Sequence, residues 1–253
     1  PSYMQIASEA ITNGGTVVYV PCDEDYVIDL IDILNAITEN TKIISLVNPN
    51  NPLAKIIHKD AMASFIAEVP DGIVVCVDEA YYEYVQTENY ESCVSYIFQD
   101  LPVVIIRTLS KVFGLAGARV GYTLASAELT NQISNTQLYG TVSRVTQAAA
   151  IAGLDDLDHI NDTVALNNTA KTILYTGFTN LGLQYIPSET SFIMVDVNTE
   201  AIPVVEGLAD LGYLVRTGWD MPQHLRVSTG TTEEMNGFLI ALETVLDTVA
   251  VQS

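Results

Sequence analysis

The chain has 253 residues, enough for one large or two modest domains, and 49% of them are hydrophobic, which supports a folded core and excludes extensive disorder. Its 31 acidic and 10 basic residues give a formal net charge of -21 at pH 7, a balance that disfavours binding to nucleic acid or to anionic membranes. No apolar run approaches the roughly 20 residues that cross a bilayer, so no membrane-spanning segment is expected.

The first half of the chain alternates short apolar runs, rich in β-branched residues, with segments of helical spacing. Strands buried on both faces have this composition, and a strand–helix alternation predicts an α/β fold, a mostly parallel sheet with covering helices. The predicted strands are residues 16–20, 43–47, 73–77, 103–108 and 120–125, and the predicted helices between them are 27–38 and 58–69.

The second half changes character. Helices are predicted at 128–136, 143–153 and 155–180, the last long enough to bridge two domains. A small α+β domain follows, and the predicted division is residues 1–154 and 155–253. Its expected elements are strands 192–197, 213–216 and 225–228, a helix near 201–211, and a helix over 235–249 that begins near a hydroxyl cap at Thr231.

Polar groups follow three consecutive strands of the predicted sheet. The turn 48–52 (NPNNP) follows the first, Asp78 follows the second, and Thr108, Ser110 and Lys111 end the third. Ligands of open α/β sheets bind at the carboxyl edge of the strands. A plain loop, a helix cap and a solvated lysine explain each feature taken alone, but three such edges in succession favour a binding site.

The chemistry of that edge depends on its cations. Lysine amines form Schiff bases with carbonyl compounds, pyridoxal phosphate among them, and hydroxyls with an arginine bind phosphate. Four cations stand in apolar or Gly-rich settings: Lys111, Arg119, Arg216 and Arg226. Lysines with polar neighbours, Lys171 among them, are predicted to be ordinary surface charges.

Three motifs carry a resemblance to a known family. NPNNP at 48–52, DEAYYEY at 78–84 and RTLSKVFGLAGARVGY at 107–122 are similar to the fold-type I pyridoxal-phosphate aminotransferases, most of all to histidinol-phosphate aminotransferases. The resemblance implies a large pyridoxal-phosphate-binding domain, here N-terminally incomplete, and a smaller C-terminal α+β domain. It also implies a homodimer, because family sites are completed across the subunit interface.

The resemblance implies a role for each residue at the sheet edge. Lys111 would bond to the cofactor aldehyde and carry the proton at the substrate α-carbon, while Asp78 would pair with the ring nitrogen. Tyr3 would stack on the ring, although a core tyrosine at a helix start explains it equally well. The remaining contacts are the phenolic oxygen with Asn51 and Tyr81, and the phosphate with Thr108, Ser110 and Arg119.

The substrate is expected to meet the two arginines of the small domain. Arg226 lies in an apolar strand, where an unpaired charge is costly, and Arg216 ends another strand. By resemblance they would bind the anions of a phosphorylated amino alcohol or amino acid and of glutamate or 2-oxoglutarate; a strand-end surface cation is the alternative for Arg216. The expected reaction converts histidinol phosphate and 2-oxoglutarate to imidazole acetol phosphate and L-glutamate.

Three alternatives stay open: an aromatic amino-acid aminotransferase, a phospho-amino-acid decarboxylase and a truncated non-catalytic relative. The chain departs from the family at Leu53 and Ala54, where Thr-Gly is usual, and at Ser191, where asparagine is common. An N-terminal region that would cradle the cofactor phosphate is expected to be missing.

The positions of the cysteines and histidines indicate the cellular compartment and whether a metal site is expected. Cys22, Cys76 and Cys93 are widely separated and lack CxxC spacing, which suggests neither a disulfide framework nor a zinc site. The three histidines lie in unrelated segments, so no metal is expected. Reduced cysteines and the lack of a signal-peptide pattern predict a cytoplasmic protein.

Overall fold

The computed structural model describes residues 1–136 and 140–252, and the chain divides into two compact units. The N-terminal unit comprises Ser2–Asn51 and Ile56–Ile160; the C-terminal unit comprises Asn161 onward together with Pro1 and Pro52–Lys55. This division falls inside helix α7 (Leu157–Asn180), and the domain boundary at 154/155 stays a prediction.

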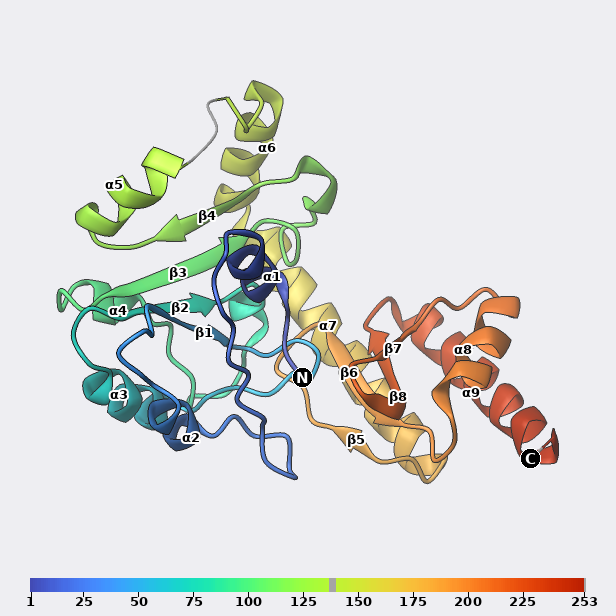
Figure 1. Cartoon of the computed structure of the whole chain (residues 1–253). Helices are drawn as coiled ribbons and strands as arrows, with labels where there is room; N and C mark the ends of the chain where they lie inside the picture. Colours follow the sequence, from blue (N-terminus) through green and yellow to red (C-terminus); the bar gives the residue numbers. More distant parts are fainter. Residues whose placement is uncertain (137–139, 253) are drawn as a thin grey trace. The chain divides into compact units, whose positions relative to one another are not determined.

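The N-terminal unit is built on a four-stranded sheet of order β1-β2-β3-β4 (Figure 1). The predicted α/β fold with a mostly parallel sheet is confirmed, since only the last strand pair is antiparallel. The strands are β1 (Ile43–Val47), β2 (Val74–Asp78), β3 (Val103–Thr108) and β4 (Gly121–Leu124).

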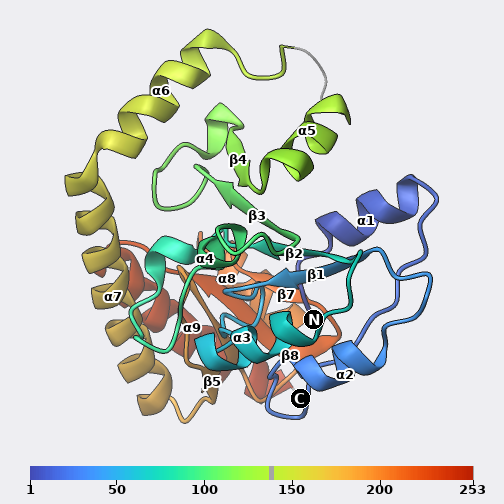
Figure 2. The ribbon, with the colours of Figure 1, turned by 90° about the vertical axis from the view of Figure 1, so that its left-hand side faces the viewer.

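One face of this sheet is covered by helices. Alternate strand residues such as Leu46, Val77 and Ile105 point into a core that Phe65 completes. The helices packed there are α2 (Leu30–Asn35), α3 (Lys59–Glu68) and α4 (Val94–Ile97), and Figure 2 shows α2 and α3 side by side near β1.

The other helices of this unit are α1 (Gln5–Thr12), α5 (Ala127–Thr136) and α6 (Arg144–Asp155), and the 3-10 turns are η1 (Tyr82–Tyr84) and η2 (Ala116–Ala118). Across the described parts of both units, no helix is long and apolar enough to cross a membrane.

The C-terminal unit packs helices on an antiparallel sheet of order β5-β6-β8-β7. Leu174 and Phe178 of α7, Ile193 of β6 and Phe238 of α9 meet in its core. The elements after α7 are β5 (Tyr185–Ile186), β6 (Phe192–Asp196), α8 (Ala201–Asp210), β7 (Arg216–Gly218), β8 (Met221–Ser228) and α9 (Thr232–Gln252).

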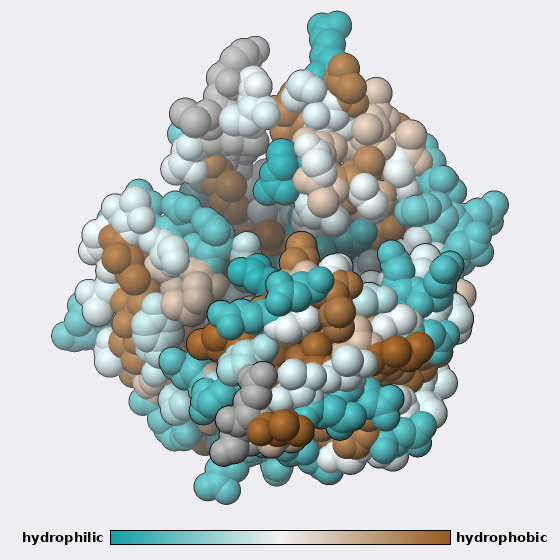
Figure 3. Space-filling view, turned by 90° about the vertical axis from the view of Figure 1, so that its right-hand side faces the viewer, coloured by the Kyte–Doolittle hydropathy of each residue, from teal (hydrophilic) through white to brown (hydrophobic). Residues whose placement is uncertain are grey.

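The surface carries isolated apolar side chains. Ile202, Leu214 and Ile240 of the C-terminal unit are exposed. Figure 3 shows brown hydrophobic residues scattered among teal hydrophilic ones on one face of the molecule. Single exposed apolar side chains of this kind are common on folded proteins.

Two predicted strands differ from the structure. Residues 16–20 belong to neither sheet, and Val18 is 69% exposed. β-branched side chains favour extended backbone, but a strand forms only where a partner edge accepts its ladder of hydrogen bonds. Residues 213–216 also shift, since only Arg216 lies in β7, which continues to Gly218.

Gly121 tests the packing of β4 on β3. A Cβ added there would lie 2.6 Å from the Arg107 carbonyl oxygen, a backbone atom that cannot move aside cheaply. We expect Gly121→Ala to destabilise the protein by about 1–3 kcal/mol, as overpacking does. Thermal and urea unfolding measure the loss.

Gly117→Ala is the matched control, because a Cβ at Gly117 meets nothing within 4 Å. Equal unfolding midpoints for the two variants would contradict the close approach of β4 to β3.

Candidate active site

The carboxyl ends of the parallel strands meet at one edge of the N-terminal sheet. Asp78 pairs in register with Val47 of β1 and Ile106 of β3. The Asn48 amide donates to the Asp78 carbonyl oxygen at 2.9 Å, and the Glu79 amide donates to the Ile106 carbonyl oxygen at 2.9 Å. These bonds continue the ladder one step past the strands and fix the backbone of the edge.

Asp78 places a buried carboxylate at this edge. The side chain is only 9% exposed, and its Oδ1 accepts a hydrogen bond of 2.9 Å from the Ala80 amide. Burial raises the pKa of the Asp78 carboxyl above its ordinary value, while the Ala80 amide and the charge of Lys111 oppose the rise. The carboxylate is therefore poorly solvated and lies within electrostatic reach of the lysine.

Lys111 lies above an aromatic ring. Its Nζ is 5.0 Å from the ring centroid of Tyr81, a cation–π distance. Tyr81 is itself buried, with its ring 6.4 Å from that of Tyr84. The structure thus brings together the predicted amine, carboxylate and phenol on the loops that follow β2 and β3.

The predicted phosphate-binding residues are only partly assembled. Thr108 Oγ1 donates to Ser110 Oγ at 2.9 Å and accepts from the Ser110 amide at 3.1 Å, so the two hydroxyls lie together. Arg119 is exposed, has left-handed backbone (φ 54, ψ 56) and donates to the Ala116 carbonyl oxygen at 3.0 Å. No hydrogen bond joins Arg119 to either hydroxyl in the described chain.

Asn51 and Tyr3 lie on segments that are tethered to each other. Asn51 is half-buried and follows the buried Asn50, whose Nδ2 donates to Ser2 Oγ at 3.2 Å. Tyr3 is the next residue after Ser2 and precedes α1. Its side chain is 49% exposed, so the alternative of a core tyrosine is wrong.

The two predicted substrate arginines face each other across β7 and β8. Arg216 is paired in register with Arg226. The Arg226 guanidinium lies 4.9 Å from the Phe192 ring centroid and 5.3 Å from that of Trp219, whereas Arg216 is exposed. Like charges opposite each other destabilise a sheet unless an anion offsets them, so the pair suits an anionic ligand.

Sequence reasoning missed a buried ion pair beside the site. Glu79 Oε2 and Arg107 Nη2 are 2.8 Å apart, and the Glu79 side chain is fully buried. Arg107 occupies an apolar strand, the same feature that singled out Arg226, so the pattern that could have found it was present.

Lys171 is a second correction. It is 7% exposed, its Nζ donates to the Ser188 carbonyl oxygen at 2.9 Å, and burial lowers the pKa of its ammonium group. The prediction of a surface charge is therefore wrong. Its helical register with Leu174 and Phe178, three and seven residues on, was the missed indication.

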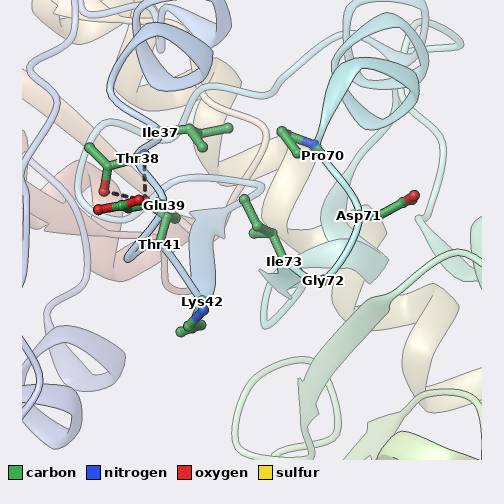
Figure 4. Close-up of a pocket in the computed structure, with 9 residues that line it drawn as sticks. All are labelled: Ile37, Thr38, Glu39, Thr41, Lys42, Pro70, Asp71, Gly72 and Ile73. Atoms are coloured by element: carbon green, nitrogen blue, oxygen red, sulfur yellow. Dashed lines mark hydrogen bonds between the residues drawn. The ribbon is translucent and has the colours of Figure 1, made fainter.

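A pocket lies at the other end of β1 and β2. Its volume is ≈ 340 Å³, and it is formed by the segments that lead into the two strands (Figure 4). The strands are parallel, so this pocket is at the amino edge of the sheet, opposite Asp78. Its lining residues are Ile37, Thr38, Glu39, Thr41, Lys42, Pro70, Asp71, Gly72 and Ile73.

A mostly parallel α/β sheet with a lysine amine, a buried aspartate and a tyrosine at its carboxyl edge is typical of the class of enzymes that use a lysine amine on a carbonyl group. Comparison with known proteins identifies the family to which the chain belongs. The family model of the class I and II aminotransferases matches residues 1–242, and the chain belongs to this family.

Individual relatives agree with that placement. The chain is 36% identical to histidinol-phosphate aminotransferase of Caldicellulosiruptor saccharolyticus over 97% of its own length and 69% of the relative's. It is 37% identical to histidinol-phosphate aminotransferase 1 of Nitrosococcus oceani over 87% of this chain and 60% of that one. The chain thus spans about two thirds of the length of these relatives.

A solved structure shares the fold. Histidinol-phosphate aminotransferase from Sinorhizobium meliloti, in complex with pyridoxal-5'-phosphate, superposes with a TM-score of 0.91 at 28% identity. The match covers 98% of this chain and 69% of that one.

Burial of Asp78 predicts a stability cost. Because the folded-state pKa lies above the ordinary 3.8, the folded state binds more protons than the unfolded state between the two values, and stability falls as pH rises through that window. We expect cofactor-free Asp78→Asn to unfold at a higher temperature than the wild type at pH 7, because asparagine can still accept from Ala80 without a buried charge.

The difference in melting temperature should shrink as the pH falls below 3.8, because the wild-type carboxyl is then protonated in both the folded and the unfolded state. A less stable Asp78→Asn at neutral pH would contradict a desolvated carboxylate.

Proposed function

We propose that the chain is a pyridoxal-phosphate-dependent transaminase that converts histidinol phosphate and 2-oxoglutarate to imidazole acetol phosphate and L-glutamate, a step of histidine biosynthesis. The observation that carries the proposal is the meeting of the Lys111 amine with the Tyr81 ring and the buried Asp78. The names of the relatives at 36% and 37% identity support the choice of substrate.

The donor set suits pyridoxal phosphate. The cofactor offers an aldehyde, a basic ring nitrogen, a phenolic oxygen and a phosphate; the edge of the sheet offers a lysine amine, a buried carboxylate, a tyrosine and two adjacent hydroxyls. When bound, the cofactor supplies an electron sink for bond cleavage at the substrate α-carbon.

The protein side of the reaction follows from burial and charge. Asp78 would pair with the ring nitrogen and favour its protonated form, because a buried carboxylate strongly favours a cation beside it. Lys111 would hold the cofactor through its aldehyde, and the Nζ amine would move the proton at the substrate α-carbon.

The remaining residues orient the cofactor. Tyr81 and Asn51 would donate hydrogen bonds to the phenolic oxygen, and Tyr3 would cover the ring. Thr108 and Ser110 bind the phosphate with their hydroxyls. Arg119 adds its charge after it releases the Ala116 carbonyl oxygen, which an exposed arginine can do at little cost.

Arg226 and Arg216 bind the substrate anions. Arg226 lies near two aromatic rings and receives the carboxylate of glutamate or the phosphate of histidinol phosphate. Arg216, exposed and opposite it, provides the second cation. Two cations on neighbouring strands suit both a phosphate monoester and a dicarboxylate, as a reaction that alternates between these substrates requires.

We further propose that the enzyme works as a homodimer in the cytoplasm. The family resemblance supports the dimer, and the three cysteines, which form no disulfide with one another, are consistent with a reducing compartment.

An absorbance titration tests the cofactor assignment. Purified chain with pyridoxal phosphate should develop a visible band that Lys111→Ala abolishes, because only the Nζ amine bonds to the aldehyde. Lys42→Ala is the control, since Lys42 is exposed and lies before β1, at the amino edge of the sheet.

Histidinol phosphate should then bleach the band much faster than phenylalanine. Bleaching by phenylalanine instead indicates an aromatic amino-acid transaminase. Carbon dioxide released from a phosphorylated amino acid indicates a decarboxylase. No band in the wild type rejects the cofactor assignment and favours a non-catalytic relative.

Arg216 tests the substrate assignment. We expect Arg216→Gln to lower kcat/KM for histidinol phosphate by about tenfold to a hundredfold, the usual worth of a hydrogen bond to a charged group, and to leave an aromatic amino acid nearly unaffected. Single-turnover rates with each amino donor give the ratio, and Lys42→Gln controls for the change in net charge. Equal losses for both donors would reject a phosphate-binding role for Arg216.

A further inference from the structure

The segment from Asp78 to Tyr82 has two sets of contacts. Asp78 and Tyr81 are the residues within reach of Lys111. Glu79 and Tyr82 both contact Arg107 instead: Glu79 by an ion pair, and Tyr82 with its ring centroid 4.0 Å from the guanidinium carbon. One arginine therefore holds the segment at its second and fifth residues, while its first and fourth carry the proposed chemistry.

Glu79 is anchored on the helix-covered side of the sheet. Its carboxylate accepts from the Ser92 hydroxyl at 2.9 Å and from the Cys93 amide at 2.8 Å, and Cys93 belongs to the covered core. It also accepts from Arg107 Nε at 3.1 Å and Nη2 at 2.8 Å. Four donors thus surround a carboxylate whose side chain is fully buried.

Arg107 is held as firmly as its partner. Its Nη2 also donates to Ser92 Oγ at 2.8 Å. Burial alone would lower the pKa of the Arg107 guanidinium, but the hydrogen bond and charge of Glu79 raise it above the ordinary value. The Arg107 guanidinium therefore stays charged, and its bonds to Glu79 and Ser92 hold it in place.

We infer that Glu79 and Arg107 form a positioning pair for the proposed cofactor chemistry: they clamp the backbone of residues 78–82 from the covered side of the sheet and so fix where the Asp78 carboxylate and the Tyr81 phenol lie. The inference rests on the proposed function for what those two groups do, but the clamp itself is a property of the chain alone.

Stability is a weak reason for such a pair. Desolvation of two buried charges offsets most of their attraction, and apolar residues of similar volume often serve as well. Geometry is a stronger reason. Residues 78 and 79 are adjacent and point to opposite faces of the sheet, so any rotation of the backbone at Glu79 displaces Asp78 in the opposite direction.

The Ala80 amide reports on the clamp without cofactor, because it donates to Asp78 Oδ1 at 2.9 Å. In the cofactor-free protein we expect Glu79→Gln to raise the hydrogen-exchange rate of this amide about tenfold or more, relative to amides of β1, by local opening. Ser92→Ala removes one hydroxyl that donates to Glu79 and should raise the exchange rate of the Ala80 amide by a smaller factor. If Glu79→Gln fails to fold, the exchange rate in Ser92→Ala tests the inference.

Phe65→Leu is the matched control. Phe65 lies in the same covered core and its shortening lowers stability, but it takes no part in the clamp. Unchanged exchange at Ala80 in both Glu79→Gln and Ser92→Ala would overturn the inference, and so would a rise of equal size in Phe65→Leu.

A double-mutant cycle on the dissociation constant of pyridoxal phosphate tests the link to Asp78. If Glu79 acts through Asp78, Glu79→Gln should weaken binding about tenfold in the wild type and less than about threefold in Asp78→Asn. Additive effects would overturn the inference. If the wild type binds no cofactor, the proposed function fails, and exchange at Ala80 still decides whether the clamp exists.

Discussion

The end of β2 holds two adjacent carboxylates in opposite environments, and the site depends on keeping them there. Glu79 is neutralised by four donors on the covered side, while Asp78 has one backbone donor and the more distant charge of Lys111. Burial raises the pKa of Asp78, and the Glu79 charge adds to the rise. Arg107 offsets this repulsion from one side and Lys111 from the other.

Because the chain is strongly acidic, binding of an anionic substrate depends on the few cations near the site. With a net charge of -21, the mean field repels anionic substrates, and it falls off over roughly 8 Å at physiological salt. An anion must therefore be attracted locally. Arg216 and Arg226 sit on paired strands of one unit, and Lys111 sits at the sheet edge of the other, so each unit has its own anion-attracting cation.

The sequence predicted the structure best where an element depends on its own residues and not on distant partners. β1 and β3 have the predicted bounds, because an apolar β-branched run between polar turns has few other stable conformations. The edge residues followed from the rule that parallel strands end together. Residues 16–20 failed because strand formation depends on a partner edge, which is not a local property. Arg107 and Lys171 were missed because burial of a charge depends on partners distant in sequence, here Glu79 and Ser188.

The proposed cofactor contacts differ in how far they are organised in advance. The ring-binding groups, Asp78 and Tyr81, are buried and belong to a clamped segment. Thr108 and Ser110 bond to each other, and Arg119 lies exposed on a carbonyl oxygen. Fixed groups lose little entropy on binding, whereas exposed side chains must be ordered. Asp78 and Tyr81 would therefore lose less conformational entropy on binding a cofactor than Arg119 would.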